Sequence, residues 1–397
     1  MSEAVIVAVS RSPIGRAFKG SLVSLRGDDL ALQIVQDVLR RVPQFNPQNL
    51  DDVILGCSLA GGEQGFNLGR VLAIRMGLDE VPGTTVNRYC ASSLQTTRMA
   101  FHAIRAGEAR AVLSVGLESV SRQASNSPDD IDLRNSEFLN LPEPSNPWED
   151  PRKFGILPNV HISMGMTAEN VASHSGVSRI EMDEFAFRSQ QLTARAIDNG
   201  FWEKDITPVT LPDGGLVNKD DGPRPSTTLE GLSELKPVFR EDGTVTAGNC
   251  CGLNDGAAAV LILEGDYARE LGITPLARIV STAVSALSPE IMGLGPIEAS
   301  RKALQIAGLK PKDIDQVEIN EAFAAQVIPS YKELGFSLDQ VNVNGGAISI
   351  GHPYGMTGAR ITSTLVNSLN FHDQEFGLET MCVAGGMGMA MVVQRLS

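Results

Sequence analysis

Cysteine is scarce in this sequence, and its spacing gives no sign of a structural role. The 397 residues include five cysteines, at positions 57, 90, 250, 251 and 382. They form no Cys-x-x-Cys pair and no disulfide-like framework, which fits a reducing compartment better than an oxidising one. No Cys or His spacing is that of a zinc site, so we expect no metal.

Positive charge and long apolar runs are also lacking. Lys and Arg number 33 against 47 Asp and Glu, a net charge of −14, which argues against general nucleic-acid binding. An anionic ligand would therefore need a local basic site. No apolar run has membrane-spanning length, residues 1–11 lack a signal-peptide profile, and the C-terminal Arg-Leu-Ser is not the usual peroxisomal signal. We expect a soluble, cytoplasmic protein.

What the sequence does contain is an alternation of strand-like and helical patterns. Residues 5–9, 53–55 and 111–115 are short apolar runs, and residues 28–41 and 92–106 have helical periodicity. This pattern predicts an α/β fold with a covered, largely parallel sheet.

The middle of the chain differs from both ends. Residues 121–158 are rich in Ser, Asn, Asp and Pro and predict an insertion or loop region. Further helices are predicted over residues 167–175 and 179–199, which argues against a purely disordered linker.

The early pattern then returns. Residues 46–53 and 309–317 each follow a helical segment and lead into an apolar strand. Val-Asn pairs at 86–87 and 343–344 each precede small residues and a helix. Two matches in the same order predict a duplicated α/β unit with a site at the junction of its halves.

Cys90 lies between a strand-like run and a helical pattern, in the segment VNRYCASS of residues 86–93. Unpaired N–H groups and the positive end of the helix dipole favour a thiolate at such a position. This segment alone is consistent with a nucleophile for acyl transfer and equally with a buried structural cysteine.

Three further motifs lie in the last third of the chain. They are Asn-Glu-Ala-Phe-Ala at 320–324, Gly-His-Pro-Tyr-Gly-Met-Thr-Gly-Ala-Arg at 351–360, and Cys-Val-Ala-Gly-Gly-Met-Gly at 382–388. Gly-rich loops can cradle phosphate, but none of these has the P-loop lysine or the GxGxxG spacing. Gly351 and Pro353 fix the backbone around His352, which favours a positioned group over a core histidine.

Together these motifs resemble the thiolase family across essentially the whole chain. Supporting matches are RSPIG at 11–15, GMTAEN at 165–170 and GTVTAGN at 243–249. The resemblance implies a five-layer α-β-α-β-α fold of two similar halves with an inserted loop domain. The implied boundaries are 1–120 with 245–270 for the N-terminal half, 121–244 for the coenzyme A-binding loop domain, and 271–397 for the C-terminal half.

The resemblance also implies an activity. A thiolase transfers acyl groups between acyl-CoA and acetyl-CoA, by Claisen condensation or by CoA-dependent cleavage of 3-ketoacyl-CoA, and takes part in fatty acid metabolism and β-oxidation. It implies coenzyme A or acyl-CoA as substrate, no permanently bound cofactor, and a homodimer or homotetramer. Direction and chain length stay open.

Catalytic roles follow from the same resemblance. Cys90 would carry the acyl group as a thioester, and His352, with an ordinary pKa of about 6.5, would take the Cys90 proton. Cys382 would remove or return the α-proton of the second acyl-CoA. His352 and a water held by Asn320 would form one oxyanion hole, and the backbone N–H groups of Cys90 and Ala384 the other.

Substrate contacts are implied for six residues: Met164, Arg224, Phe239, Ala247, Cys251 and Phe323. Arg224 would meet nucleotide phosphates, with an exposed surface residue as the less favoured alternative; the others could equally be plain core. His102, His161, His174 and His372 match no motif and are expected to be structural or at the surface.

Three departures from the family pattern stand out. Ala384 replaces a Gly whose N–H would serve the oxyanion hole, which survives if the local φ is negative. Cys250-Cys251 replaces a small residue and Ser, so a pantetheine hydrogen bond would be weaker. Ser163-Met164 replaces the His-Met of short-chain acetoacetyl-CoA thiolases, which leaves longer or unusual acyl chains open.

Two rival functions remain. A β-ketoacyl synthase shares the fold but lacks a second catalytic cysteine, so Cys382 argues against it. A catalytically silent acyl-CoA-binding relative would have lost Cys90, His352 or Cys382, and all three are present.

Overall fold

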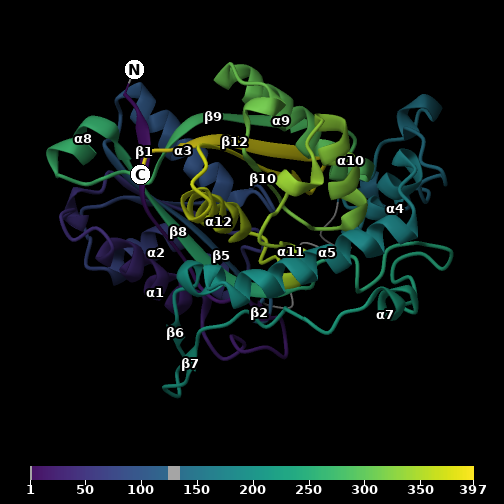
Figure 1. The fold of residues 1–397 in the computed structure, drawn as a ribbon, viewed down its shortest axis with the longest axis horizontal. Helices are drawn as coiled ribbons and strands as arrows, with labels where there is room; N and C mark the ends of the chain where they lie inside the picture. Colours follow the sequence, from purple (N-terminus) through teal and green to yellow (C-terminus); the bar gives the residue numbers. More distant parts are fainter. Residues whose placement is uncertain (1, 124–134) are drawn as a thin grey trace.

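A ten-stranded sheet runs through the computed structural model, which describes residues 2–123 and 135–397 (Figure 1). Its strands follow the order β10-β11-β12-β9-β1-β8-β5-β3-β4, with β2 beside β8. They are β1 (Ala4–Arg11), β2 (Gly15–Arg16), β3 (Asp52–Gly56), β4 (Gly83–Val86), β5 (Ala111–Ser119), β8 (Asn254–Glu264), β9 (Ala277–Ala286), β10 (Gln316–Ile319), β11 (Phe376–Val383) and β12 (Met387–Arg395).

The sheet is mixed, so the expectation of a largely parallel sheet is wrong. Only β3 with β4, β3 with β5, and β10 with β11 pair in parallel. The other pairs are antiparallel because β12 returns from β11 through a three-residue turn, and β8 re-enters only after the long insert. Helical crossovers, which produce parallel pairs, join only part of each half.

The strand order confirms the predicted duplication. One half runs β4-β3-β5-β8-β1, and the other runs Val341-β10-β11-β12-β9, where Val341 forms only a parallel bridge to Val317. The pairings agree in direction at every step. Only Val5 and Ile6 of β1 pair with β9, so the two runs meet along a short seam.

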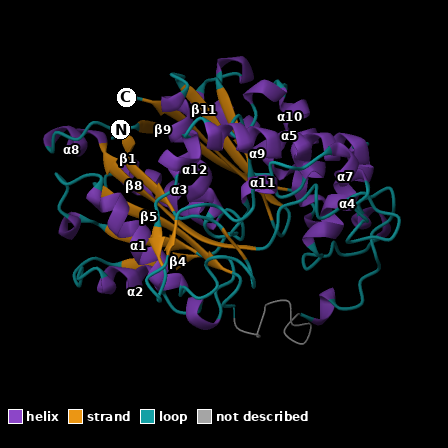
Figure 2. Ribbon diagram, turned by 60° about the horizontal axis from the view of Figure 1, so that its bottom comes forward, coloured by secondary structure: helices purple, strands orange, loops and turns teal. Residues whose placement is uncertain are grey.

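Helices cover the sheet on both faces, and two lie between the halves (Figure 2). The inner helices α3 (Ser92–Ala106) and α12 (Thr357–Phe371) pack on each other; α3 packs on strands of the first half, and α12 packs on strands of both halves. The outer faces carry α1 (Gly27–Arg40), α2 (Leu68–Arg75) and α8 (Gly265–Glu270) on the first half, and α9 (Gly295–Ala307) and α10 (Ala324–Leu334) on the second.

Alternation along the strands explains this layering. In β1, Ile6 belongs to the inner core that contains Leu94 of α3 and Ile361 of α12, whereas Val5 and Val7 face the outer core. Both faces of the strand are therefore apolar, as a sheet between two helical layers requires. The result is the predicted five-layer α-β-α-β-α arrangement.

The insert between β5 and β8 carries its own helices. They are α4 (Met164–Ser175), α5 (Arg179–Asp198), α6 (Phe201–Asp205) and α7 (Leu229–Ser233), with the two-stranded sheet of β6 (Val209–Thr210) and β7 (Leu216–Val217). The helices predicted over residues 167–175 and 179–199 are confirmed as α4 and α5. A Ser178–Glu181 capping box starts α5. Of the predicted loop 121–158, residues 124–134 lie outside the described residues.

Short helical turns complete the chain. They are η1 (Pro47–Asn49), η2 (Gly62–Gln64), η4 (Ser136–Phe138), η5 (Pro151–Phe154), η6 (Pro289–Leu294), η7 (Pro311–Asp313), η8 (Leu338–Gln340) and the four-residue helix α11 (Ala347–Ile350). Within the described residues, no helix combines the length and apolarity needed to cross a bilayer.

Candidate active site

A pocket of about 670 Å³ opens where the two halves and the insert meet. Cys90 reaches it from the first half, His352 and Cys382 from the second, and Met164 from the insert. Residues distant in sequence thus converge on one cavity. Its full lining is Cys90, His161, Ile162, Ser163, Met164, Gly165, Phe239, Cys250, Cys251, Gly252, Leu253, Met292, Ala322, Phe323, His352, Tyr354 and Cys382.

Cys90 lies in a tight turn between β4 and α3, which we call the Cys90 elbow (residues 87–91). Tyr89, just before the cysteine, has φ 46°, a left-handed conformation that costs energy in a non-glycine residue. The Asn87 side chain accepts a hydrogen bond from the Tyr89 N–H at 2.8 Å and donates one to the Ser58 carbonyl at 2.8 Å. These bonds hold the strained turn in place.

Burial makes Cys90 a thiol at rest, so the expectation that the helix start favours a thiolate is wrong. Burial raises its pKa to about 12, although the Ala384 N–H, hydrogen-bonded to the sulfur, acts in the opposite direction. The charge of Glu118 adds to the increase. Desolvation outweighs the helix terminus because the thiol is only 8% exposed. Nucleophilic attack therefore requires a base.

His352 lines the same pocket as Cys90. Its Nδ1 lies 2.6 Å from Thr357 Oγ1, and this hydroxyl donates its proton to the Pro353 carbonyl at 2.7 Å. The hydroxyl therefore accepts from Nδ1–H, and we infer that Nε2 carries the lone pair of the ring.

The protonation state of His352 differs from the expectation of an ordinary pKa. Burial first, and the charge of Arg360 second, lower its pKa to about 3. At neutral pH the ring is thus uncharged. The backbone N–H of His352 donates a hydrogen bond to Asn254 Oδ1 at 2.9 Å, which fixes the backbone of the loop.

Asn320 lies beside the imidazole at the end of β10. Its Nδ2 is 3.3 Å from His352 Nε2, and its Oδ1 accepts from Arg360 at 3.4 Å. Because Arg360 can only donate, the amide oxygen of Asn320 faces Arg360 and its N–H₂ group faces the imidazole ring. The structure therefore puts both predicted partners of one oxyanion hole next to each other.

Cys382 is the second thiol of the pocket, near the end of β11. It is 1% exposed, and its pKa is raised by burial first and by the charge of Cys90 second. The turn after it has positive φ at Gly385 (76°) and Gly386 (80°) but not at Ala384. The φ of Ala384 is therefore not positive, as the survival of the predicted oxyanion hole requires, and its backbone N–H is hydrogen-bonded to Cys90.

Of the six residues predicted to contact substrate, the structure places four in the pocket lining and two outside it. Met164, Phe239, Cys251 and Phe323 line the pocket, and the rings of Phe239 and Phe323 meet edge-on at 6.2 Å. Two other predicted residues, Ala247 and Arg224, are exposed and do not belong to this lining.

Cys251 is a third pocket sulfur. Its N–H donates to the Ala322 carbonyl at 3.0 Å, which joins the 249–251 segment to the Asn-Glu-Ala-Phe motif. Burial, and then the charges of Cys250, Cys90 and Cys382, raise its pKa. It is thus an uncharged thiol in a largely apolar wall.

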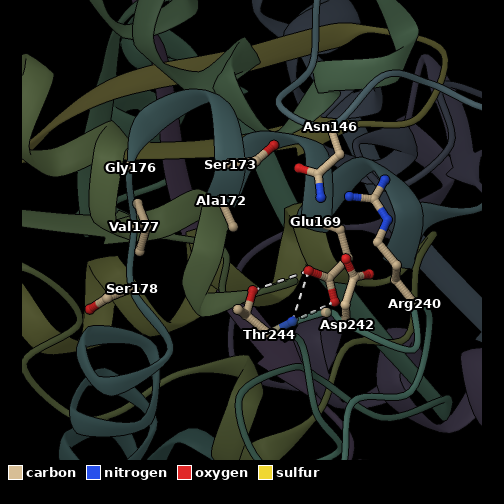
Figure 3. A pocket seen from close by; sticks show the side chains of 11 residues that line it. Asn146, Glu169, Ala172, Ser173, Gly176, Val177, Ser178, Arg240, Asp242 and Thr244 are labelled. Atoms are coloured by element: carbon tan, nitrogen blue, oxygen red, sulfur yellow. Dashed lines mark hydrogen bonds between the residues drawn. The ribbon is translucent and has the colours of Figure 1, made fainter.

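A second, smaller cavity of about 270 Å³ lies between α4 and residues 240–244 (Figure 3). Inside it, the Glu169 carboxylate accepts from the Thr244 N–H and hydroxyl and from the Val245 N–H, at 2.8–3.1 Å. This anchor ties the GTVTAGN segment to the insert, and Phe239 and Ala247 flank the tied residues in sequence.

Sequence reasoning missed several residues of the site. His161, expected to be structural or at the surface, is exposed and lines the pocket with Ile162, Leu253, Met292 and Tyr354. No motif marks the first four, since only the fold brings them together, whereas Tyr354 lies within the recognised segment 351–360. Thr357 lies within a recognised motif, and its five-residue spacing from His352 could have suggested a role.

Comparison with known proteins agrees with this architecture and pocket. Two family models match: thiolase, N-terminal domain, over residues 4–266, and thiolase, C-terminal domain, over residues 273–395. The chain belongs to the thiolase family.

Full-length relatives carry several names. The chain is 41% identical to the 3-ketoacyl-CoA thiolase of Bacillus subtilis, over 99% of this chain and 100% of that protein. It is 41% identical to an acetyl-CoA acetyltransferase of Escherichia coli and 40% identical to a β-ketoadipyl-CoA thiolase of Acinetobacter baylyi, each over 100% of both chains.

Solved structures of thiolases also align with nearly the whole chain. Bacillus anthracis acetyl-CoA acetyltransferase aligns with a TM-score of 0.89 and 37% identity, over 100% of this chain and 99% of that one. Human mitochondrial 3-ketoacyl-CoA thiolase in complex with CoA aligns with a TM-score of 0.87 and 37% identity, over 99% and 98%.

Proposed function

We propose that this protein is an acetyl-CoA C-acyltransferase that cleaves 3-ketoacyl-CoA with coenzyme A and catalyses the reverse Claisen condensation. The observation that carries the proposal is the meeting of Cys90, Cys382 and a neutral His352 in one pocket. The names of the full-length relatives support the same activity.

Cleavage begins with the first thiol. Cys90 Sγ attacks the C3 carbonyl of the 3-ketoacyl-CoA while its proton passes to His352 Nε2. The C2–C3 bond breaks, its electron pair leaves with the acetyl-CoA fragment, and Cys382 protonates that carbon. The acyl chain stays on Cys90 as a thioester.

Free coenzyme A completes the cycle. Its thiol gives its proton to the Cys382 thiolate and attacks the acyl-Cys90 thioester. The acyl-CoA product, two carbons shorter than the substrate, leaves, and His352 returns its proton to Cys90. Condensation is the same sequence in reverse, in which Cys382 removes the α-proton of acetyl-CoA.

Two sets of hydrogen-bond donors would stabilise the negative oxygens formed in these steps. The amide of Asn320, beside His352, supports a water-mediated site. The N–H of Ala384, already directed at Cys90, supports the second site together with the Cys90 N–H.

Coenzyme A would enter along the insert. We propose residues 121–244 as its loop domain, between an N-terminal half of residues 1–120 and 245–270 and a C-terminal half of residues 271–397. Pocket residues Met164, Phe239, Cys251 and Phe323 would contact pantetheine or acyl chain. Exposed Arg224 would meet phosphate, with Ala247 along the path.

The apolar lining supports an aliphatic acyl chain. Ile162, Met292 and Phe323 offer surface to a chain attached at Cys90. We further propose a cytoplasmic homodimer or homotetramer, a state that light scattering of the purified protein measures directly.

A substrate panel tests the activity. CoA-dependent loss of the 3-ketoacyl-CoA enolate absorbance is measured with acetoacetyl-CoA, longer aliphatic 3-ketoacyl-CoAs and 3-oxoadipyl-CoA. We expect cleavage of the aliphatic substrates, and no activity across the panel would refute the proposal.

Covalent labelling tests the roles of the two thiols. With radiolabelled acetyl-CoA, Cys90→Ala should take up no label, whereas Cys382→Ser should be labelled but fail to turn over. Equal labelling of Cys90→Ala would reject Cys90 as the acyl carrier.

A further inference from the structure

A buried carboxylate lies at the end of β5, close to the pocket but outside its lining. Glu118 is 0% exposed and follows apolar residues along a wholly buried strand. It pairs with Gly256 of β8. Val112, six residues earlier on the same strand, belongs to the inner core, so alternation puts the Glu118 side chain on the face that meets the other half.

Four neutral groups donate hydrogen bonds to this carboxylate. Its Oε2 accepts from the N–H groups of Ser58 at 3.0 Å and Gly355 at 2.7 Å. Its Oε1 accepts from the Leu59 N–H at 3.0 Å and, more weakly, from the Cys57 thiol at 3.7 Å. The carboxylate is thus an acceptor for two separate loops.

One of these loops supports the nucleophile. Glu118 fixes the Ser58 N–H, and the Ser58 carbonyl accepts from Asn87, whose side chain holds the Tyr89 N–H. Cys90 follows directly. A chain of three hydrogen bonds therefore runs from the carboxylate to the strained residue before the nucleophile.

The other loop carries the base; we call residues 351–356 the His352 loop. A Cβ on Gly355 would lie 2.4 Å from the Leu117 carbonyl oxygen and 2.8 Å from Cys57 Cα, so its backbone touches the first half directly. Glu118 binds the N–H at this point of closest approach. It is a link between His352 and the half that carries Cys90.

We propose that Glu118 is a positioning residue for acyl transfer, which holds the Cys90 elbow and the His352 loop in register across the junction of the halves. The inference rests on the proposed function and assigns a role to a residue that does not touch the substrate. Misplacement of reacting groups by about 1 Å costs on the order of 100-fold in rate, so such a link affects turnover strongly.

The energetics of the site agree with this role. Burial raises the pKa of Glu118 to about 7, whereas the N–H bonds from Gly355, Leu59 and Ser58 lower it. Its charge also disfavours the Cys90 thiolate. Glu118 therefore does not help to activate the Cys90 thiol. Its contribution to the reaction is the placement of the two loops.

The test replaces Glu118 with Gln, which keeps the shape but turns one acceptor into a donor facing backbone N–H groups. The amount of Cys90 that can be acylated is measured with radiolabelled acetyl-CoA, and kcat is expressed per acylated site. We expect kcat per site to fall about 10- to 100-fold, with KM for coenzyme A changed less than about twofold.

Glu379→Gln is the matched control. Glu379 is equally buried, lies on β11 and accepts from Thr362 of α12, away from both loops. It should lower stability but leave kcat per acylated site unchanged. An unchanged value in Glu118→Gln would overturn the proposal, because a merely structural role reduces only the number of active sites.

Glu118→Asp covers the case in which the Gln variant fails to fold. It keeps the charge but is too short to reach both loops, so kcat per site should again fall; full kcat per site would overturn the proposal. If the wild-type protein itself cleaves no 3-ketoacyl-CoA, the proposed function fails instead, which separates the two outcomes.

Discussion

The two halves share strand order and register but differ in what their strand ends carry. In the second half, β10 ends before Asn320 and β11 carries Cys382; in the first, β3 ends before Cys57 and β5 carries Glu118. The second half thus places an amide and a thiol at the pocket, and the first a thiol and a carboxylate behind it.

The helix starts show the opposite division. Cys90 precedes α3 in the first half, whereas the corresponding segment of the second half leads into the short α11. The proposed nucleophile therefore comes from one half, and the proposed base and the second thiol come from the other. The halves share an architecture, and the pocket takes side chains from both.

The junction that joins them is closely packed. The Ala359 N–H of α12 donates to Ser93 Oγ of α3 at 2.8 Å, and a Cβ on Gly358 would lie 2.1 Å from the Leu94 nitrogen. Backbone approaches this close fix the relative position of Cys90 and His352. The predictions below break or sharpen this dependence of one half on the other.

The largest effect is expected when the base is removed from the second half. In the proposed mechanism Cys90, whose pKa burial raises to about 12, gives its proton to His352. His352→Gln should lower the rate of Cys90 acylation by about 10²- to 10⁴-fold, measured by rapid quench with radiolabelled acetyl-CoA.

His102→Gln is the control for that variant, since His102 is an exposed histidine on α3. It should acylate at the wild-type rate. Acylation at an undiminished rate in His352→Gln would mean that the two halves do not share this proton.

The state of the Cys90 thiol gives the next effect. Because deprotonation is favoured as pH rises and the pKa is about 12, alkylation by iodoacetamide should increase about tenfold per pH unit from pH 7 to 9. Mass spectrometry of the Cys90 peptide measures the rate. A plateau already reached at pH 7 would show a thiolate and contradict the dominance of burial over the helix start.

A smaller effect is expected from the hydroxyl that orients the base. Thr357→Val keeps the shape but removes the acceptor for His352 Nδ1–H, so turnover should fall about 10- to 100-fold with little change in KM for coenzyme A. Thr364→Val on the same helix, whose hydroxyl bonds Asp205, should leave kcat unchanged. Equal kcat in both variants would remove Thr357 from the site.

The sequence predicts the local parts of this site and not the contacts that join them. Cys90, His352 and Cys382 are each marked by neighbours in the chain, and two repeated segments reveal the duplication. The pKa directions of Cys90 and His352 could not be predicted, because burial depends on the other half. Glu118 carries one signal, a lone carboxylate in an apolar strand, but its bond to Gly355 spans 237 positions.

The smallest effect concerns the turn that replaces a family glycine. Ala384 contributes its N–H, and its φ is not positive, so the methyl group is tolerated where it stands. Ala384→Gly should change kcat by less than about twofold and destabilise the fold by about 0.4–1 kcal/mol through the more flexible unfolded chain. Gly386→Ala is the contrast: its φ is 80° and a Cβ would lie 2.3 Å from the Leu287 carbonyl oxygen, so activity should fall sharply. A large gain in kcat for Ala384→Gly would show that the alanine distorts the second oxyanion hole.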